Sequence, residues 1–264
     1  MTGRVPLDRA LSKMGLASRT DARALIVDGR VTVDGVTITD PRRLVRPERQ
    51  RIAIDGDVAP PPARRLIVFH KPRGLVTTRR DPEGRKTVFD ALGSAGDGLQ
   101  AVGRLDQAST GLLLFTNDTR LADQLTDPAR AIPREYVVTV RGRLDDLATK
   151  RLCTGLDVAA ARGRTDEGSR TERLTATTVT ILKASSRESH AIVTLTEGKN
   201  RELRRMFEAL GHEVTRVHRI RFGPFELGTL QPGEWREAPL SLARTATTDR
   251  RPAGGRRART PSGR

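Results

Sequence analysis

Five short runs of residues that favour β-strands lie between residues 64 and 242, and they restrict the fold more than any other feature. Each run is rich in valine, isoleucine, threonine or aromatic residues and is bounded by glycine or proline. The runs are RLIVFHKP, LLLF, EYVVTV, TATTVTIL and HAIVTLTE. Helical patterns are fewer, at TRLADQL and NRELRRMFEAL, so strands and helices do not alternate as in βαβ units. The pattern predicts an α+β fold in which a mixed, mainly antiparallel sheet has helices on its faces.

The residues before this region predict a small domain that begins with two helices. Leu7, Leu11 and Met14 are spaced by four and three and form one apolar stripe, which Gly15 ends. The segment 18–21 has the spacing of a capping box, in which the serine hydroxyl takes an orphan amide and the aspartate reaches back. A second helix is therefore expected to begin there.

A β-hairpin is expected after these helices. Val31 to Ile38 form two alternating runs around Asp34-Gly35, and a tight primed turn needs positive φ at both central residues. Together the helices and the hairpin make a platform for RNA, with arginines on its outward faces. These are Arg19, Arg23, Arg30, Arg42 and Arg43. The alternative is that this basic surface is only solvated.

The stretch SRTDARALIVDGRVTVDG resembles the S-four-type RNA-binding domain, a module of ribosomal proteins and RNA-modifying enzymes. In that family a second arginine follows Ser-Arg and an asparagine precedes the turn glycine, whereas this chain has Thr20 and Asp34 there. The loss of one arginine and the gain of one carboxylate are expected to weaken phosphate contact. The resemblance implies that the N-terminal domain binds RNA.

The proline run APPPA at 59–63 predicts the first domain boundary, because consecutive prolines keep the chain extended. We therefore expect an RNA-binding domain at 1–63 and a second domain at 64–242. Residues 243–264 have no apolar periodicity and contain seven arginines against one aspartate, which predicts a disordered basic tail. Such a tail adds salt-dependent affinity for RNA without sequence preference, or it only solubilises the protein.

The charge of the chain points to a polyanionic partner. Lys and Arg number 48 against 32 Asp and Glu, a formal net charge of +16. Only six of these cations are lysine, and arginine pairs with phosphate through two hydrogen bonds and stacks on bases. A GC-rich genome also favours arginine over lysine, but it does not explain the net charge.

Several classes of protein are not expected. No apolar window is long enough to span a membrane, and the N-terminus lacks a signal-peptide core, so a cytoplasmic protein is expected. Cys153 is the only cysteine and four histidines are scattered, which leaves neither an internal disulfide nor a zinc site. GSAGDG at 93–98 lacks the spacing of a dinucleotide-binding loop. We expect no metal, and a monomer is the simplest assembly.

The segment VGRLDQASTGLLLFTND at 102–118 holds the main candidate for chemistry. Asp106 lies between a Gly-Arg turn and an apolar strand, and Ser109, Thr110 and Gly111 can tighten the loop. A carboxylate at the entrance of a core strand is expected to be partly buried and to face a cleft. An aspartate in this place is also a common turn former, and the residues alone leave both interpretations open.

Three segments resemble, in their order along the chain, the pseudouridine synthases that join a small RNA-binding domain to a catalytic core. They are HKPRGLVTT, GRLDQASTGLLLFTND and EGKNRELRRMFEALGHEVTRVHRIRFGPFELGTLQPGEW. The resemblance runs from about residue 6 to 240. It implies the cofactor-free isomerisation of a specific uridine in ribosomal RNA, and the EGKNRELRRM segment favours 23S over 16S rRNA.

The resemblance implies three catalytic residues. Asp106 matches the family's invariant aspartate, which acts as a nucleophile or eliminates the base from the ribose. Lys199 stands where the family places the cation that pairs with this aspartate and keeps it ionised. Tyr136, the only tyrosine, matches a residue that stacks on the flipped uracil and assists late proton removal. Without the resemblance, Lys199 is an exposed loop lysine and Tyr136 a core or edge residue.

The resemblance also implies a set of substrate-binding residues. Leu203 gives the apolar wall opposite the tyrosine, and Arg104 fills the gap that the extruded base leaves. Other cations are expected to contact RNA phosphates or to line the cleft. They are Lys71, Arg73, Arg201, Arg204 and Arg205.

A non-catalytic factor of ribosome assembly on the same scaffold is the competing hypothesis. The presence of Asp106, Tyr136 and Lys199 together favours the enzyme, since a protein that only binds RNA does not need all three. The expected partner is ribosomal RNA or a precursor of a ribosomal subunit.

Overall fold

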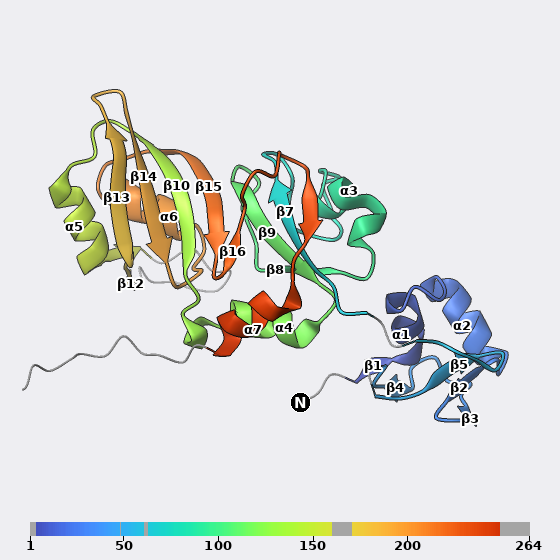
Figure 1. The fold of residues 1–264 in the computed structure, drawn as a ribbon. Coiled ribbons are helices and arrows are strands. Elements are labelled where there is room, and N and C mark those ends of the chain that lie inside the picture. Colours follow the sequence, from blue (N-terminus) through green and yellow to red (C-terminus); the bar gives the residue numbers. More distant parts are fainter. Residues whose placement is uncertain (1–3, 48, 61–62, 160–170, 249–264) are drawn as a thin grey trace, which may run out of the picture.

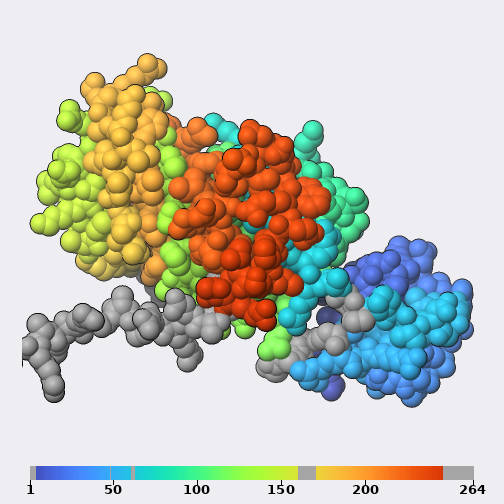
Figure 2. Space-filling view, viewed as in Figure 1, coloured from blue at the N-terminus to red at the C-terminus, as the bar shows by residue number. Residues whose placement is uncertain are grey.

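The computed structural model describes residues 4–47, 49–60, 63–159 and 171–248. Their buried apolar side chains form three separate clusters. The buried residues between Leu7 and Ile52 form one cluster of their own. Figure 1 shows this part, in blue, beside the larger part with the long strands, and Figure 2 shows it as a distinct lobe. The two parts meet in the chain at the proline run, of which residues 61–62 lie outside the described ranges.

The N-terminal domain consists of two helices and short antiparallel strands. Its elements are β1 (Val5–Pro6), α1 (Leu7–Lys13), α2 (Arg19–Val27), β2 (Val31–Val33), β3 (Val36–Thr37), β4 (Leu44–Val45), β5 (Ile52–Ile54) and β6 (Asp57–Val58). One sheet has the order β3-β2-β5-β6, and β1 pairs with β4. The predicted helix pair and hairpin are confirmed.

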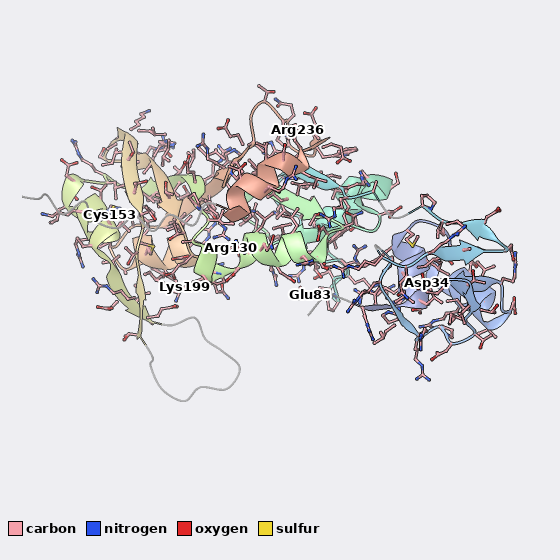
Figure 3. The ribbon with its side chains drawn as sticks, turned by 60° about the horizontal axis from the view of Figure 1, so that its bottom comes forward. Asp34, Glu83, Arg130, Cys153, Lys199 and Arg236 are labelled. Atoms are coloured by element: carbon pink, nitrogen blue, oxygen red, sulfur yellow. The ribbon has the colours of Figure 1, made fainter. Side chains whose placement is uncertain are left out.

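Local chemistry explains where these elements begin and turn. The Ser18 hydroxyl accepts a hydrogen bond from the Asp21 amide at 3.2 Å and so caps α2. Asp34 and Gly35 have φ angles of 53° and 82°, as the primed turn between β2 and β3 requires. Figure 3 labels Asp34, whose carboxylate also accepts from the Arg51 amide at 2.8 Å and so holds the turn against the start of β5.

The larger part of the protein contains one nine-stranded sheet, one separate pair of strands and the helices around them. Its elements are β7 (Leu66–Lys71), α3 (Val88–Leu92), the 3-10 helix η1 (Gly93–Gly96), β8 (Gln100–Val102), β9 (Thr110–Thr116), α4 (Thr119–Thr126), η2 (Pro128–Arg130), β10 (Arg134–Arg141), α5 (Asp146–Thr154), β11 (Leu156–Ala159), β12 (Thr171–Leu174), β13 (Thr178–Ala184), β14 (Glu188–Leu195), α6 (Glu202–Glu208), β15 (Val214–Phe222), β16 (Phe225–Glu226), β17 (Trp235–Glu237) and α7 (Leu240–Thr248). The strand order is β13-β14-β10-β15-β9-β7-β17, with β8 on β9 and β16 on β15.

The sheet is mixed and mainly antiparallel, as predicted. Among the described strands, only β9 and β15 pair in parallel. The sheet therefore joins two antiparallel halves at this seam. The two apolar clusters lie on opposite faces of the sheet, because Ile67 and Phe69 of β7 belong to the first cluster and the alternate residues Leu66 and Val68 belong to the second. Helix α6 packs in the first cluster, while α4 and α7 lie close together and pack in the second (Figure 1).

The segment 154–174 contains the antiparallel strands β11 and β12, and its residues 160–170 lie outside the described ranges. The disordered tail predicted to begin at residue 243 is wrong for its first six residues, which form the C-terminal part of α7. Ala243 in this helix is 2% exposed and packs in the second cluster. Residues 249–264 of that tail also lie outside the described part. In the described helices, none combines the length and the apolar character that a membrane span needs.

Candidate active site

Asp106 lies in the connection between β8 and β9, and hydrogen bonds fix this loop on both sides of it. The Thr77 hydroxyl donates to the carbonyl of Leu105 at 2.8 Å and accepts from its amide at 3.3 Å. On the other side, the Gly74 amide donates to the Gln107 carbonyl at 2.8 Å. The Pro-Arg-Gly turn therefore holds the loop in which the carboxylate lies.

The carboxylate of Asp106 is exposed, whereas the sequence predicted it to be partly buried. Leu105 and Ser109 take the inward positions of the loop, with 7% and 4% of their surface exposed. Asp106 consequently faces outward from a rigid loop. This arrangement gives a large substrate access to the carboxylate without requiring the loop to open.

Lys71 stabilises the same loop from the interior of the protein. At the end of β7 it is fully buried, and its Nζ donates to the carbonyl oxygens of Ser109 at 2.8 Å, Pro72 at 3.1 Å and Gln107 at 3.4 Å. Burial lowers the pKa of Lys71 to about 8, and the charge of Asp106 acts in the opposite direction. The expectation that Lys71 contacts the RNA backbone or lines the cleft is wrong, because the strand turns this side chain into the protein.

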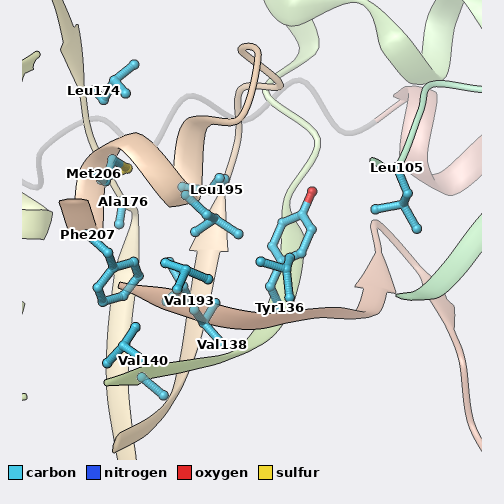
Figure 4. Packing of buried hydrophobic residues seen from close by; sticks show 14 of the residues in the cluster. Leu105, Tyr136, Val138, Val140, Leu174, Ala176, Val193, Leu195, Met206 and Phe207 are labelled. Carbon is cyan, nitrogen blue, oxygen red and sulfur yellow. The ribbon is translucent and has the colours of Figure 1, made fainter. Parts of the chain in front are cut away.

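An apolar wall lies beside the loop and comes from three elements. Leu105, Tyr136 on β10 and Leu203 on α6 belong to the same cluster and are 7%, 8% and 6% exposed. Figure 4 shows the phenol oxygen of Tyr136 pointing away from the packed side chains of Val138 and Val193. The tyrosine, the leucine and the residue next to Asp106 therefore lie in one apolar cluster.

Arg204 is the arginine of α6 whose charge acts on Asp106. Burial lowers the pKa of Arg204, as do the charges of Arg201 and Arg73, whereas the Asp106 carboxylate raises it. The Nη1 group of Arg204 donates to the Val214 carbonyl at 2.6 Å, which fixes the guanidinium. Two cations from separate elements, Arg204 and Lys71, thus act electrostatically on the one carboxylate.

Lys199 does not occupy the place predicted for it. Its Nζ lies 2.5 Å from a carboxylate oxygen of Glu197 and donates to the Arg173 carbonyl at 3.0 Å. The hydrogen bond that Lys199 donates to Glu197 raises the pKa of Lys199, and the other acids that act on it are Glu202 and Glu172, not Asp106. Figure 3 labels the residue at the edge of the molecule. The loop before α6 directs Lys199 toward β12, so the expected pairing of Lys199 with Asp106 is wrong, and Arg204 is the cation of this motif on which the charge of Asp106 acts.

The remaining arginines near α6 and the loop fall into two groups. Arg205 forms an ion pair with Glu172 and donates to the carbonyls of Ala159 and Asn200, both at 3.0 Å, so it ties α6 to the β11–β12 pair rather than facing phosphate. Arg73, Arg104 and Arg201 are exposed and, within the described residues, form no ion pair. These three side chains remain available to a polyanion.

Three of the arginines singled out in the N-terminal domain, those that were expected to bind RNA from α2 and the turn after it, are engaged with carboxylates. Arg19 and Arg23 lie 3.7 Å and 2.9 Å from the buried Asp8, and Arg30 pairs with Asp55. Their side chains are still half exposed or more. Part of their charge is therefore compensated within the protein.

Arg219 is a residue of the site that the sequence analysis missed. It is 2% exposed, its Nε donates to the Leu112 carbonyl at 2.7 Å, and its guanidinium carbon lies 6.0 Å from the ring centroid of Tyr136. It lies next to Tyr136 in the register of β10 and β15. The alternating pattern of RVHRIRF was the available signal, but it does not reveal which strand lies alongside.

The geometry suits a reaction at a sugar carbon during which the detached base is held by the protein. A carboxylate lies on a fixed loop and interacts electrostatically with two cations, and an apolar wall with one phenol can stack on a flat ring. The part of the chain that the structure describes contains no group of three or more histidine, cysteine or acidic side chains placed to hold a metal ion.

Comparisons with known proteins give the family. The model of the RNA pseudouridylate synthases matches residues 65–209, and that of the S4 domain matches residues 5–50. An uncharacterized RNA pseudouridine synthase of Aquifex aeolicus is 33% identical over 88% of this chain and 90% of its own length. The ribosomal large subunit pseudouridine synthase B of Yersinia pestis is 38% identical over 89% and 72%, respectively.

A solved structure agrees with the fold. The crystal structure of a pseudouridylate synthase superimposes with a TM-score of 0.61 at 24% identity and covers 92% of this chain and 99% of its own. The family model spans the loop of Asp106, strand β10 and all of α6, which are the elements that build the site. The chain therefore belongs to the family of RNA pseudouridine synthases and carries an N-terminal S4 domain.

Proposed function

We propose that this enzyme isomerises a uridine of 23S ribosomal RNA to pseudouridine, with Asp106 as the group that acts on the ribose. The observation that carries the proposal is the exposed Asp106 carboxylate on a fixed loop, with Arg204 and Lys71 acting on it and Tyr136 in the adjoining wall. The relatives named ribosomal large subunit pseudouridine synthase B support the choice of RNA.

The reaction rearranges bonds without adding or removing atoms. The bond from N1 of uracil to C1′ of ribose breaks, the base turns over, and a bond from C5 to C1′ forms. The proton on C5 leaves, and N1 takes up a proton, so no oxidant, reductant or cofactor is consumed. Asp106 attacks C1′ or promotes elimination of the base, and both steps require its ionised form.

The other side chains bind and hold the nucleotide. The uridine has to leave its stack, which costs a few kcal/mol and is offset by contacts to phosphates. Arg104 is exposed two residues before Asp106 and replaces the base in the stack, while Arg73 and Arg201 hold the backbone. Tyr136 stacks on the detached uracil opposite Leu203, and its phenol assists the loss of the C5 proton.

Release of tritium from RNA labelled at uridine C5 tests the activity. Wild-type protein is expected to release label into water, and Asp106→Asn is expected to release none above background. Asp123→Asn, which alters an exposed aspartate on α4, is the matched control and should retain wild-type release. Binding of ribosomal RNA without release from naked RNA or from subunits would instead indicate a non-catalytic assembly factor.

The target is tested by mapping pseudouridines in ribosomal RNA from a strain that lacks the gene. Loss of one site in 23S rRNA, restored by the wild-type gene but not by the Asp106→Asn variant, is expected. A missing site in 16S rRNA would contradict the proposed substrate while leaving the enzyme activity intact.

A further inference from the structure

We propose that an arginine-lined hollow in the S4 domain binds a phosphodiester of the substrate RNA backbone. The hollow has a volume of about 490 Å³ and is lined by Arg4, Arg43, Leu44, Arg46, Arg49 and Gln50. It differs from the face of α2 on which Arg19 and Arg23 lie. The inference rests on the proposed function in one respect, since it takes RNA to be the substrate.

The pairing of β1 with β4 builds one side of the hollow. The two strands are antiparallel with Val5 opposite Val45, and one further step of this register brings Arg4 opposite Arg46. Side chains alternate between the faces of a strand. Val45 is 1% exposed in the core, so its neighbours Leu44 and Arg46 face the other way.

The turn after β4 closes the other side. The amides of Arg49 and Gln50 both donate to the Arg46 carbonyl at 2.9 Å, which curls the chain back over Arg46. The Gln50 side chain accepts from the Arg46 amide at 2.7 Å and donates to Asp34 at 2.8 Å. The rim is therefore anchored to the β2–β3 turn and exists before any ligand binds.

The charges in the hollow have no counterion within the described residues. Arg4, Arg43, Arg46 and Arg49 form no ion pair there, in contrast to Arg19, Arg23 and Arg30. The Nε of Arg46 is buried and has no hydrogen-bond partner. Buried donors of this kind are normally satisfied, and like charges around one hollow repel each other. A bound anion satisfies the donor and removes the repulsion.

A phosphodiester fits this chemistry better than a carboxylate side chain of another protein. Guanidinium groups bind two phosphate oxygens at once, and several of them converge here from different segments. Leu44 is 52% exposed at the same site and offers an apolar surface to a ribose or base next to the phosphate. The volume also lies in the range of sites for nucleotide-sized ligands.

The test compares two double variants that remove the same charge. Arg43→Gln with Arg49→Gln changes two exposed residues of the hollow, and Arg9→Gln with Arg51→Gln changes two exposed residues of the domain outside it. The dissociation constant for a 23S rRNA fragment is measured between 50 and 200 mM KCl, a range over which phosphate contacts weaken strongly. The hollow variant is expected to bind roughly tenfold more weakly, with a salt slope smaller by about 1. The control is expected to stay within about twofold of wild type. Equal effects in both variants would overturn the proposal.

Arg46→Lys and inorganic phosphate complete the test. This variant keeps the charge but loses the planar guanidinium, so RNA affinity is expected to fall while thermal unfolding shows that the domain stays folded. Titration of the full-length protein with inorganic phosphate separates the sources: weak binding that RNA displaces supports the proposal. Tight phosphate binding together with wild-type RNA affinity in the hollow variant would overturn it, because the hollow would then be a site for a small anion. Absence of tritium release from wild type would refute the proposed reaction, whereas these affinities test the hollow separately.

Discussion

Substitution of Arg204 tests which cation acts on the carboxylate of Asp106. Arg204→Gln removes a guanidinium on which the charge of Asp106 acts, together with its hydrogen bond to the Val214 carbonyl. Loss of this charge and this charge-assisted hydrogen bond, about 1.5–3 kcal/mol, predicts a fall in kcat/KM of roughly 10- to 100-fold in the tritium assay.

Lys199→Gln is the matched control for this prediction, since it removes one positive charge five residues earlier in the same motif. The Nζ of Lys199 contacts Glu197 and the Arg173 carbonyl, so kcat/KM is expected to change by no more than about threefold. A larger loss for Lys199→Gln than for Arg204→Gln would contradict the assignment.

The buried ammonium of Lys71 makes stability depend on pH. Its pKa is about 8 in the folded protein against 10.5 for an unperturbed lysine, so between these values the unfolded chain binds more protons than the folded one. The free energy of unfolding is therefore expected to rise with pH over this window through Lys71. Urea unfolding of wild type and Lys71→Met at pH 7.5 and 10 checks it, because the difference in free energy between the two proteins should shift in favour of wild type at the higher pH. A constant difference would show that Lys71 keeps an ordinary pKa.

At the scale of the elements, the seam between β9 and β15 depends on Gly111. This residue has a φ of 104°, and a Cβ there would meet the Arg219 backbone, with its nitrogen at 2.6 Å. Gly111→Ala is expected to destabilise the protein by about 2–4 kcal/mol in urea unfolding, since neither backbone can move without breaking the sheet. Gly198→Ala, where nothing lies within 4 Å and φ is not positive, is expected to change stability little. Equal losses would mean that the close approach is not what limits this position.

The same seam shows how far the sequence could predict the fold and the site. The alternating runs around Tyr136 and His190 and the turn at Asp34 are local patterns, and they predicted β10, β14 and the hairpin. The parallel pairing of β9 with β15 joins residues more than a hundred positions apart, and no local pattern encodes it. Helix α5 was missed for a different reason: its apolar residues are few and Leu147 is 67% exposed.

For the site, the motifs supply candidate residues, and the fold decides the direction of their side chains. Asp106, Tyr136 and Leu203 come from the motifs, and Tyr136 and Leu203 lie in the same apolar cluster as Leu105, the neighbour of Asp106. Lys199 and Arg204 lie in one motif and carry the same charge, so only the start of α6 and the fold of the preceding loop decide which of them acts on Asp106. Arg219 could not be found without knowing that β15 lies beside β10.

At the scale of the whole molecule, the separate cores predict a division of labour between the two domains. The N-terminal cluster shares no buried residue with the two clusters of the larger part, so removal of residues 1–63 leaves the catalytic core intact. Binding energy from a domain remote from the reacting bonds acts mainly on substrate affinity. The truncated enzyme is therefore expected to show a KM for ribosomal RNA raised by roughly tenfold or more, with kcat within about threefold of the full-length value.

The salt dependence of KM distinguishes positioning of the RNA by the S4 domain from purely electrostatic attraction. If the S4 domain only attracted RNA electrostatically, raising the salt concentration would erase the difference between full-length and truncated enzyme, because screened charges no longer contribute. If it positions the RNA through a formed site, part of the difference in KM should persist at 300 mM KCl. Steady-state tritium release by both proteins at 50 and 300 mM KCl measures this. A collapse of kcat at unchanged KM would mean that the S4 domain instead takes part in forming the catalytic site.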